Sequence, residues 1–363
     1  MKDSSLAQLR RRVTRIDRRI LELARERIAC AREIGRLKIA GGLPVRDYST
    51  EREVLERTRE FCRELGLPFE LGEGVLHVLI EEAVSVQEEL REHVPRTTPG
   101  RALVLGGGGG MGSWLCRYLE AQGHAVSVLD PAGAPAGFKR AASVAEGWKE
   151  ADVVALAVPL DIGPALYQEI LALPAGPLVF DIFSLKSHVA ESIWTAVRAG
   201  HRVASIHPMF GPTARLLSGR SLVICDTGSP EAIRRVRELF EATSLGIVEI
   251  PLEEHDRRMA DVLGLSHAVN LVFARALAAS PLSAAAIAET ASTTFLKQAA
   301  TTREVVSENP SLYYQIQALN PHTPAVLRRF AESLAALRRE IDLELEEDFR
   351  REMESGRRRL AEL

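Results

Sequence analysis

Residues Arg101 to Gly112 read RALVLGGGGGMG, and this stretch decides the fold of the chain around it. A short apolar run is followed at once by glycines in the spacing Gly107-x-Gly109-x-x-Gly112, and helical periodicity begins after them. Glycines in this position permit a tight turn and let the backbone approach a pyrophosphate, which the amino end of the next helix holds through its free N–H groups. The stretch therefore predicts a strand, a phosphate-binding turn and a helix.

The strand after this turn supports the same interpretation. The next apolar run, HAVSVLD, ends at Asp130, about 20 residues beyond the glycines, where an acidic side chain can bind the adenosine ribose hydroxyls. A carboxylate there would repel a 2′-phosphate, so we expect NAD as the cofactor. By itself the glycine run could be only a flexible turn. The residues expected to bind the cofactor are Gly107, Gly109, Gly110, Met111, Gly112 and Asp130.

Patterns on either side of this stretch divide the chain. The apolar runs ADVVALAVP, PLVFDIFS and HRVASIHP alternate with helical patterns, which is typical of a parallel sheet covered on both faces. The segment before the linker VPRTTPG has three helical patterns and no strand, and the chain from about Glu254 is helical again, with one long charged helix from about Pro324. We predict an all-α three-helix domain over 1–94, a linker over 95–100, an α/β Rossmann-like NAD-binding domain over 101–253 and an all-α substrate and dimerisation domain over 254–363.

Composition excludes several classes of protein. The chain has 363 residues, and 46 Lys and Arg against 49 Asp and Glu give a formal charge of -3, which provides no general attraction for nucleic acid or an anionic membrane. No apolar stretch of about 18 residues stands out, and the amino end lacks the apolar block of a signal peptide. The four cysteines are scattered without metal-ligand spacing. We expect a cytoplasmic protein with no metal site and no nucleic-acid or membrane partner.

The segment SIHPMFGP, Ser205 to Pro212, holds the first candidate catalytic residue. His207 is followed by Pro208 and, after Gly211, by Pro212, so we expect it on a stiff loop and not inside a helix or in the middle of a sheet. Removing hydride from a carbon that bears a hydroxyl is easier when a base accepts the hydroxyl proton, and an imidazole suits that task near neutral pH. A structural histidine in a proline turn is the alternative.

Four segments in this order, GGGGGMG, DIFSLK, IHPMFGP and EEHD, resemble the prephenate dehydrogenase family, and the N-terminal segment is similar to the helical chorismate mutase domain fused to it in bifunctional enzymes of tyrosine biosynthesis. The resemblance implies rearrangement of chorismate to prephenate, followed by NAD-dependent oxidative decarboxylation of prephenate to 4-hydroxyphenylpyruvate. It also implies a homodimer and feedback inhibition by tyrosine. A choice between prephenate and arogenate as the dehydrogenase substrate stays open.

The resemblance assigns roles in the dehydrogenase half. His207 matches the family's catalytic histidine, which hydrogen-bonds the substrate 4-hydroxyl, and Ser184 matches a serine between that hydroxyl and the nicotinamide. Arg303 is the nearest match to the substrate-binding arginine, although its spacing to the following proline is one residue longer than the family pattern. His255 and His267 match family histidines, for which a helix-surface or domain-contact role is an equal alternative.

The predicted first helix of the N-terminal segment carries several candidate mutase residues. Arg27 and Lys38 are eleven residues apart and face the same side of a helix, whereas Arg10 faces about 100° away and lies too far along the axis to join them within one chain. A mutase needs only groups that hold the compact conformer and stabilise charge on the breaking ether oxygen. In the family's intertwined dimer, the first arginine reaches the other subunit's site. The resemblance therefore implies substrate binding by Arg10, Arg27 and Asp47, contacts to the ether oxygen from Lys38 and Gln87, and a hydroxyl contact from Glu51.

Two other interpretations remain open at this point. Thr50 and Ala83 replace an arginine and a serine that are frequent in the mutase family, so the N-terminal domain could be a non-catalytic sensor or dimerisation module. A 3-hydroxyacid dehydrogenase of the 6-phosphogluconate type would share the glycine turn and a helical C-terminal domain. That class predicts a catalytic lysine on a helix and does not explain the HPMFGP segment.

Overall fold

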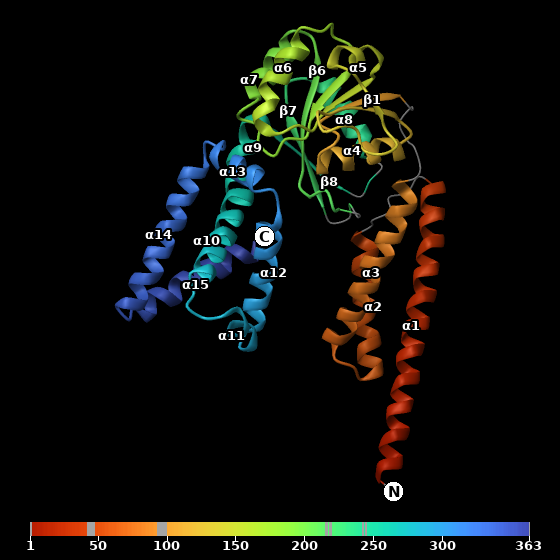
Figure 1. Ribbon diagram of the computed structural model, residues 1–363. Coiled ribbons are helices and arrows are strands. Elements are labelled where there is room, and N and C mark those ends of the chain that lie inside the picture. Colours follow the sequence, from red (N-terminus) through yellow and green to blue (C-terminus); the bar gives the residue numbers. More distant parts are fainter. Residues whose placement is uncertain are drawn as a thin grey trace. The chain divides into compact units, whose positions relative to one another are not determined.

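The computed structural model of the protein describes residues 2–41, 48–92, 100–214, 217, 220–241, 243 and 245–362. They form a helical N-terminal part, an α/β sheet part and a helical C-terminal part, as the sequence predicts (Figure 1). By its internal contacts the chain divides into two compact units. The first comprises the residues up to Val158, Gln168–Phe183 and Thr195–Ile250, and the second comprises Pro159–Tyr167, Ser184–Trp194 and the residues from Pro251 onward.

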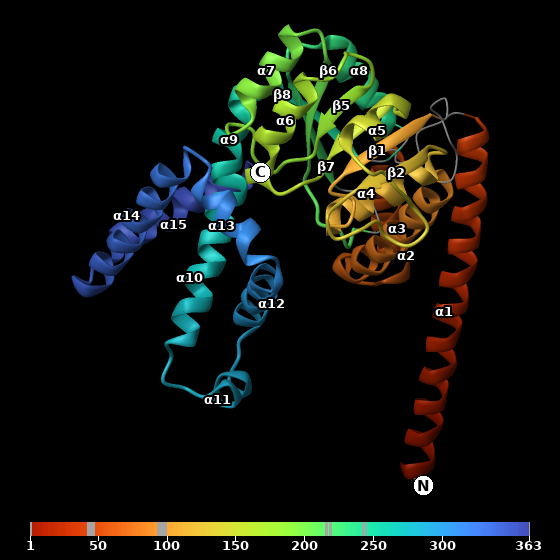
Figure 2. The same cartoon turned by 45° about the horizontal axis from the view of Figure 1, so that its top comes forward.

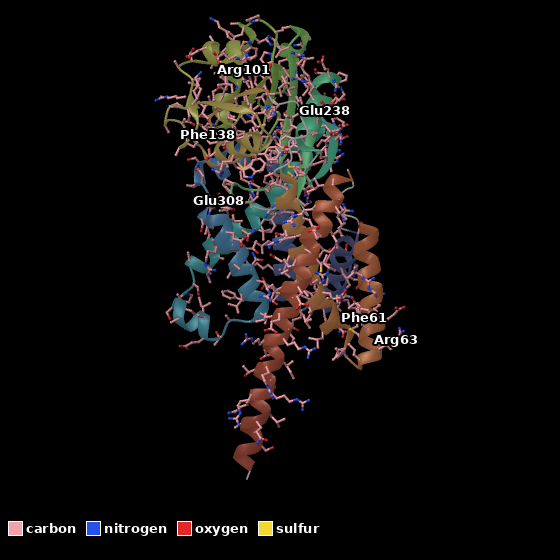
Figure 3. All side chains as sticks on the ribbon, turned by 90° about the vertical axis from the view of Figure 1, so that its right-hand side faces the viewer. Phe61, Arg63, Arg101, Phe138, Glu238 and Glu308 are labelled. Atoms are coloured by element: carbon pink, nitrogen blue, oxygen red, sulfur yellow. The ribbon has the colours of Figure 1, made fainter. Side chains whose placement is uncertain are left out.

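Three helices make up the N-terminal part: α1 (Lys2–Ala40), α2 (Tyr48–Leu65) and α3 (Phe69–Glu92). The carboxyl-terminal half of α1 packs closely on α3, and a Cβ at Gly35 would come within 2.8 Å of Cγ of Gln87. The amino-terminal half of α1 continues beyond α2 and α3 (Figures 1 and 2). This half of α1 carries an apolar stripe that is about half exposed, formed by Leu6, Leu9, Val13, Ile16, Ile20 and Leu23. Figure 3 shows the described side chains of the molecule from the side.

The α/β part is built on an eight-stranded sheet with the order β3-β2-β1-β4-β5-β6-β7-β8. The strands are β1 (Arg101–Leu105), β2 (Ala125–Leu129), β3 (Lys139–Arg140), β4 (Val153–Leu156), β5 (Leu178–Asp181), β6 (Arg202–Pro208), β7 (Ser221–Asp226) and β8 (Gly246–Pro251). Strands β1 to β6 pair in parallel, whereas β7 runs antiparallel to β6. The parallel core agrees with the apolar runs predicted from the sequence. Strands β3, β7 and β8 were not predicted.

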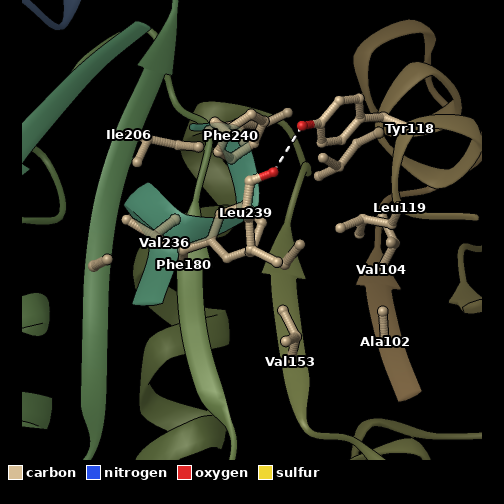
Figure 4. Packing of buried hydrophobic residues seen from close by; sticks show 14 of the residues in the cluster. Ala102, Val104, Tyr118, Leu119, Val153, Phe180, Ile206, Val236, Leu239 and Phe240 are labelled. Atoms are coloured by element: carbon tan, nitrogen blue, oxygen red, sulfur yellow. Dashed lines mark hydrogen bonds between the residues drawn. The ribbon is translucent and has the colours of Figure 1, made fainter. Parts of the chain in front are cut away.

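Helices on both faces of this sheet bury its apolar side chains. They are α4 (Gly110–Ala121), α5 (Val144–Glu150), α6 (Gly163–Leu171), α7 (Ala190–Arg198) and α8 (Pro230–Phe240). The short 3₁₀ helix η1 (Leu160–Ile162) precedes α6 in the chain. Figure 4 shows part of the core, where α4 and α8 lie against the strands. Tyr118 on α4 donates its hydroxyl hydrogen to the carbonyl oxygen of Leu239 at 2.7 Å and stacks on Phe240. These contacts fix α4, the helix that begins at the glycine turn.

The C-terminal part is helical, as predicted. It contains α9 (Leu252–Met259), the π-helical turn η2 (Ala260–Leu265), α10 (Ser266–Ala278), α11 (Ala284–Glu289), α12 (Thr293–Ser307), α13 (Pro310–Ala318), α14 (Thr323–Asp342) and α15 (Glu346–Ala361). The prediction of one long charged helix from Pro324 was wrong, because the chain breaks between α14 and α15. Glu344 adopts a left-handed conformation with φ of 55°, and the Leu345 N–H turns back to the carbonyl oxygen of Glu340 at 2.8 Å. Glycine usually marks such a helix end, and none is present here.

The run Leu252–Ala278 is long and apolar enough by composition to cross a membrane, which the sequence analysis did not anticipate. Core helices of proteins without a membrane span can have the same length and apolar composition. Two buried residues of this run, His255 and Asp256, are polar and hydrogen-bonded to each other. We therefore describe the run as helices of the second unit.

Candidate active sites

The glycine turn between β1 and α4 has the geometry of a dinucleotide site. Gly106, directly after β1, has φ of 86°, and a Cβ there would lie 2.5 Å from the carbonyl oxygen of Ala157. A Cβ at Gly112 would collide with the carbonyl oxygen of Gly106, so the helix can lie against the turn only with glycine at this position. At Gly109 the nearest atom to an added Cβ is 3.5 Å away, and the protein itself leaves room there. A glycine at that position is therefore explained by a ligand that approaches the backbone.

Asp130 closes this site at the carboxyl end of β2. Its Oδ2 accepts a hydrogen bond from the N–H of Gly108 at 2.9 Å, and its Oδ1 accepts one from the N–H of Ala132 at 2.8 Å. Both bonds hold the carboxylate beside the glycine turn, where the remaining lone pairs can accept hydroxyl hydrogens. The turn and the acid thus fit the pyrophosphate and the ribose of a dinucleotide. The motif Gly107-x-Gly109-x-x-Gly112 begins one residue after Gly106, so the sequence analysis did not identify Gly106 as the residue that makes the tight turn.

His207 is buried near the end of β6, with 4% of its surface exposed. It pairs with Val223 of β7, and Pro208 pairs with Leu222, so the expectation that this histidine lies on a loop was wrong. The physical reason is that the pairing of β6 with β5 ends at Ser205, opposite Asp181. Beyond that point β6 has a ladder on one side only, which is where a strand tolerates proline.

The segment after His207 packs on the nucleotide-binding turn. The rings of Phe210 and Trp114 meet edge to face with centroids 5.0 Å apart, and Trp114 lies in the first turns of α4. A Cβ at Gly110 would lie 3.1 Å from Cγ of Pro212. The HPMFGP segment and the amino end of α4 are therefore in direct contact within the first unit. The fold brings the candidate histidine and the candidate cofactor site to the same edge of the sheet.

In the second unit, the loop after β5 is tied to α9. This loop carries Ser184, which is partly exposed, and leads into α7. The carboxylate of Asp256 accepts hydrogen bonds from the N–H of Lys186 at 2.8 Å and from the N–H of Ser187 at 2.7 Å. Nδ1 of His255 lies 2.7 Å from Oδ1 of the same carboxylate. Burial opposes ionisation of Asp256, but the hydrogen bonds from His255 and Ser187 outweigh it and hold the pKa of this carboxyl well below its usual range.

The other two predicted residues of the second unit lie on different helices. His267, near the start of α10, stacks on Tyr313 with ring centroids 4.3 Å apart, and its Nδ1 is buried without a hydrogen-bond partner among the described residues. Burial lowers the pKa of this imidazole. Arg303 lies exposed on α12, one residue after Thr302. Thr302 donates its hydroxyl hydrogen to Oδ1 of Asn270 at 2.8 Å, which joins α12 to α10 and fixes the helix that carries the arginine.

In the N-terminal part, two predicted mutase residues, Arg27 and Gln87, make hydrogen bonds across the contact of α1 with α3. Arg27 donates a hydrogen bond from Nη1 to the carbonyl oxygen of Leu79, and burial lowers the pKa of its guanidinium. Gln87 is 7% exposed and donates from Nε2 to the carbonyl oxygen of Ala31 at 2.9 Å. Lys38 follows on the same face of α1 and is partly buried. Both Arg27 and Lys38 lie in the continuous helix α1, so their spacing of eleven residues places them on the same side of it.

The remaining mutase candidates are placed as follows. Arg10 is exposed on the amino-terminal half of α1. Asp47 lies outside the described residues, and for Glu51 and Thr50 the structure describes the backbone of α2 alone. Ala83 is partly buried on α3.

These features define a class: a dinucleotide-dependent dehydrogenase whose chain also carries a three-helix domain at its amino end. The chain matches the family models for chorismate mutase type II over residues 9–88, for the nucleotide-binding domain of prephenate dehydrogenase over 129–249 and for the dimerisation domain of prephenate dehydrogenase over 251–355. The chain belongs to the prephenate dehydrogenase family, with a type II chorismate mutase domain fused to it.

Relatives of known name match each half and the whole. The T-protein of Enterobacter agglomerans is 25% identical over 92% of this chain and 88% of its own length. The 4-amino-4-deoxyprephenate dehydrogenase of Streptomyces pristinaespiralis is 30% identical over 69% of this chain and 88% of its own length. The chorismate mutase of Methanocaldococcus jannaschii is 30% identical over 24% of this chain and 88% of its own length.

A solved structure supports the fold of the dehydrogenase half. The prephenate dehydrogenase of Aquifex aeolicus, determined with hydroxyphenyl propionate and NAD+, superposes with a TM-score of 0.60 at 17% identity and covers 74% of this chain and 99% of its own. The match of residues 9–88 to chorismate mutase type II weighs against a 3-hydroxyacid dehydrogenase of the 6-phosphogluconate type, because that class does not account for a mutase domain.

Proposed function

We propose that one polypeptide carries out two consecutive reactions, the rearrangement of chorismate to prephenate in the N-terminal helical domain and the oxidative decarboxylation of prephenate to 4-hydroxyphenylpyruvate in the remainder. The observation that carries the second reaction is the packing of the HPMFGP segment on the amino end of α4, through Phe210 on Trp114 and Pro212 on Gly110. This packing supports a base and a dinucleotide held by one rigid framework. Rigid placement of a base relative to the reacting atoms lowers the barrier of the step it serves.

In the dehydrogenase reaction, His207 accepts the proton of the substrate 4-hydroxyl as the ring carbon gives up its hydride. The electron pair of the broken ring–carboxylate bond moves into the ring as carbon dioxide leaves, and the 4-oxygen takes back a proton as the aromatic ring forms. Ser184 hydrogen-bonds the same hydroxyl and orients it. Arg303 binds a substrate carboxylate through its guanidinium, since two parallel N–H donors match a carboxylate. His255 and His267 support substrate binding from α9 and α10. The resemblance assigns no role to Lys186 or Asp256, although these residues end the segments DIFSLK and EEHD.

The cofactor is NAD in this proposal. Gly107, Gly109, Gly110, Met111 and Gly112 hold its pyrophosphate, and Asp130 accepts hydrogens from its ribose hydroxyls. The nicotinamide, when bound, supplies the acceptor for the hydride. The carboxylate of Asp130 favours NAD over NADP, because a 2′-phosphate would meet a like charge beside the Gly108 N–H.

The mutase reaction needs no cofactor and no proton transfer. Lys38 and Gln87 stabilise the negative charge that develops on the ether oxygen, Arg27 binds a carboxylate, and Glu51 accepts from the substrate hydroxyl. Asp47 is a further substrate contact. The hydrogen bonds of Arg27 and Gln87 across the contact of α1 with α3 support this set, and Lys38 lies on the same side of α1 as Arg27. Arg10 belongs to the site of a second subunit, because 28 residues of helix, about 42 Å, separate it from Lys38.

The assembly in this proposal is a homodimer in the cytoplasm. The half-exposed apolar stripe on α1 supports a partner chain at the N-terminal part, and the dimerisation-domain match supports one at the C-terminal part. Tyrosine is an expected feedback inhibitor. Dehydrogenase turnover that is unaffected by millimolar tyrosine would contradict that expectation.

A coupled assay tests the proposal. Purified protein is given chorismate with and without NAD, and both chorismate loss and NADH formation are followed. We expect chorismate loss without NAD and NADH only after NAD is added. If chorismate stays intact while supplied prephenate still yields NADH, the N-terminal domain is a sensor or dimerisation module and the substitutions Thr50 and Ala83 explain the loss. Arogenate offered in place of prephenate tests the remaining substrate choice.

A further inference from the structure

We propose that Asp256 is a positioning residue of the dehydrogenase: its carboxylate anchors the loop after β5 so that Ser184 is presented to the substrate hydroxyl. The inference rests on the proposed function of Ser184 and names a residue to which that function gives no part. The anchor lies entirely within the second unit, which contains both Ser184–Trp194 and α9.

Several hydrogen-bond donors converge on the carboxylate of Asp256. The N–H groups of Lys186 and Ser187 donate to Oδ1 and Oδ2 at 2.8 and 2.7 Å, and the Ser187 hydroxyl also donates to this carboxylate. Nδ1 of His255 lies 2.7 Å from Oδ1. The backbone donors are 69 and 70 residues away in sequence, so the contact is a tertiary anchor and not local helix capping.

The anchoring carboxylate is buried. Asp256 is 1% exposed, and water therefore cannot replace a lost partner at the carboxylate. The backbone of Asp256 is fixed as well, since its carbonyl oxygen accepts from Nδ2 of Asn320 at 2.8 Å, and Asn320 is itself 2% exposed. The anchor thus has a rigid base on the side of α9 and a loop on the other side. Ser184 is two residues before the first anchored N–H.

His255 is fully buried beside the carboxylate of Asp256. A carboxylate is an acceptor only, so it holds the hydrogen of the imidazole on Nδ1. One carboxylate thereby orders two side chains that the proposed function places at the substrate, a serine on the loop and a histidine on its own helix. An apolar replacement would satisfy neither group, and each buried donor left unpaired costs about 1–3 kcal/mol.

The test uses the full chain and the variant Asp256→Asn. An amide keeps one acceptor oxygen but turns its NH₂ toward a donor N–H in either orientation, so the anchor is lost at nearly constant volume. We expect the kcat for prephenate to fall about tenfold or more, with the dissociation constant of NAD within about twofold of wild type and mutase turnover unchanged. The matched control is Glu253→Gln, which removes an exposed carboxylate from the same helix and should leave all three values unchanged.

A double variant separates positioning from a merely structural role. If Asp256 acts by placing Ser184, adding Asp256→Asn to Ser184→Ala should lower kcat by less than about threefold further, because neighbouring residues that act together are not additive. The inference would be overturned if the two losses in dehydrogenase kcat multiplied in the double variant. It would also be overturned if Asp256→Asn kept wild-type dehydrogenase kcat, or if Asp256→Asn lowered mutase turnover as much as dehydrogenase turnover. If Ser184→Ala alone keeps wild-type turnover, the proposed role of Ser184 is at fault instead.

A second single variant covers the case in which Asp256→Asn does not fold. Ser187→Ala removes only the hydroxyl donor to Asp256 and keeps the backbone N–H. We expect a loss in dehydrogenase kcat of a few fold with unchanged mutase turnover. Wild-type kcat in Ser187→Ala, measured on folded protein, would contradict the anchor.

Discussion

At the scale of single residues, His207 is the clearest test of the dehydrogenase chemistry. Asparagine places a polar amide of similar size in this buried position, but an amide cannot accept the hydroxyl proton. We expect His207→Asn to lower dehydrogenase kcat by about a hundredfold or more, since general base catalysis contributes at least that much. Mutase turnover and the melting temperature, measured on the same preparation, should stay near wild type. A parallel loss of both activities would show that His207 is structural.

Asp130 is the residue to which the proposed function assigns the choice between NAD and NADP. Asp130→Asn removes the negative charge and keeps one acceptor oxygen for the N–H of Gly108 or Ala132. We expect KM for NAD to rise about tenfold, because a charge-assisted hydrogen bond to the ribose is weakened, and activity with NADP to improve. Steady-state kinetics with both cofactors measures this. An unchanged ratio of kcat/KM for NAD and NADP would mean that Asp130 does not contact the ribose.

The residues that sequence predicts well are those whose partners are near in the chain. The glycines and Asp130 form one site within about 25 residues, and a fixed spacing reveals it. Asp256 is different, because the loop it anchors lies about 70 residues away and only the tertiary fold brings the two together. Its burial and its donors could not be inferred from the segment EEHD itself.

At the scale of elements, Gly109 at the start of α4 and Gly112 within its first turn should respond differently to replacement by alanine. Gly112→Ala places a methyl group against the carbonyl oxygen of Gly106, so α4 must move and the melting temperature should fall by roughly 2–10 °C. Gly109→Ala meets only ordinary contacts, so the protein should melt near wild type but bind NAD about tenfold or more weakly. Thermal melts and NAD titrations distinguish the two. Equal destabilisation by both variants would contradict this division of roles.

The contact of α1 with α3 makes a separate prediction for the mutase. Lys38→Ala removes the cation assigned to the ether oxygen, and we expect mutase kcat to fall about 10²–10³-fold with dehydrogenase kcat unchanged. Arg36→Ala is the matched control, because Arg36 is exposed on the same helix and pairs only with Glu33 among the described residues. Chorismate turnover checks both variants. Mutase activity that survives Lys38→Ala would move the catalytic role elsewhere on this contact.

Elements are predicted best where burial imposes a regular pattern. The parallel strands are continuous apolar runs, and the three N-terminal helices keep their periodicity over their whole length. Strand β3 has two charged residues and exists only because it pairs with β2, so no local signal marks it. Strand β7 follows β6 with no helix between them, and β8 buries only Ile250, so neither fits the pattern of buried apolar runs separated by helices. The break between α14 and α15 depends on a glutamate in a left-handed conformation, which sequence does not indicate.

At the scale of the whole molecule, the distance between Arg10 and Lys38 predicts shared mutase sites. Each site in a dimer would combine Lys38 of one chain with Arg10 of the other. Arg10→Ala and Lys38→Ala chains should each be nearly inactive as mutases when pure. After subunit exchange in an equal mixture, one site of each mixed dimer is intact, so about a quarter of wild-type mutase activity should return. Absence of recovery, with exchange verified by mass, would exclude a site built from two chains.

The last prediction concerns stability as a function of pH. Burial lowers the pKa of His124 and of His201, each about 95% buried, and of His267. In the unfolded chain these imidazoles take up protons near pH 6.5, whereas in the folded protein they stay neutral to lower pH. The unfolded state therefore binds more protons below about pH 6.5, and the free energy of unfolding falls as the pH falls from 7 to 5, by at most about 1.4 kcal/mol per pH unit for each histidine. The depressed pKa of Asp256 acts in the same direction but below this range, because an unfolded aspartate titrates near pH 4.

His201 provides the variant that tests the cause of this pH dependence. Its ring meets Trp148 edge to face with centroids 5.9 Å apart, and its Nδ1 is buried without a hydrogen-bond partner among the described residues. Phenylalanine can keep that ring contact and cannot titrate. We expect His201→Phe to narrow the difference between the melting temperatures at pH 8 and pH 5.5, with little change at pH 8. An undiminished difference in this variant would assign the acid sensitivity to other groups, of which His124, the residue before β2, is the next to replace.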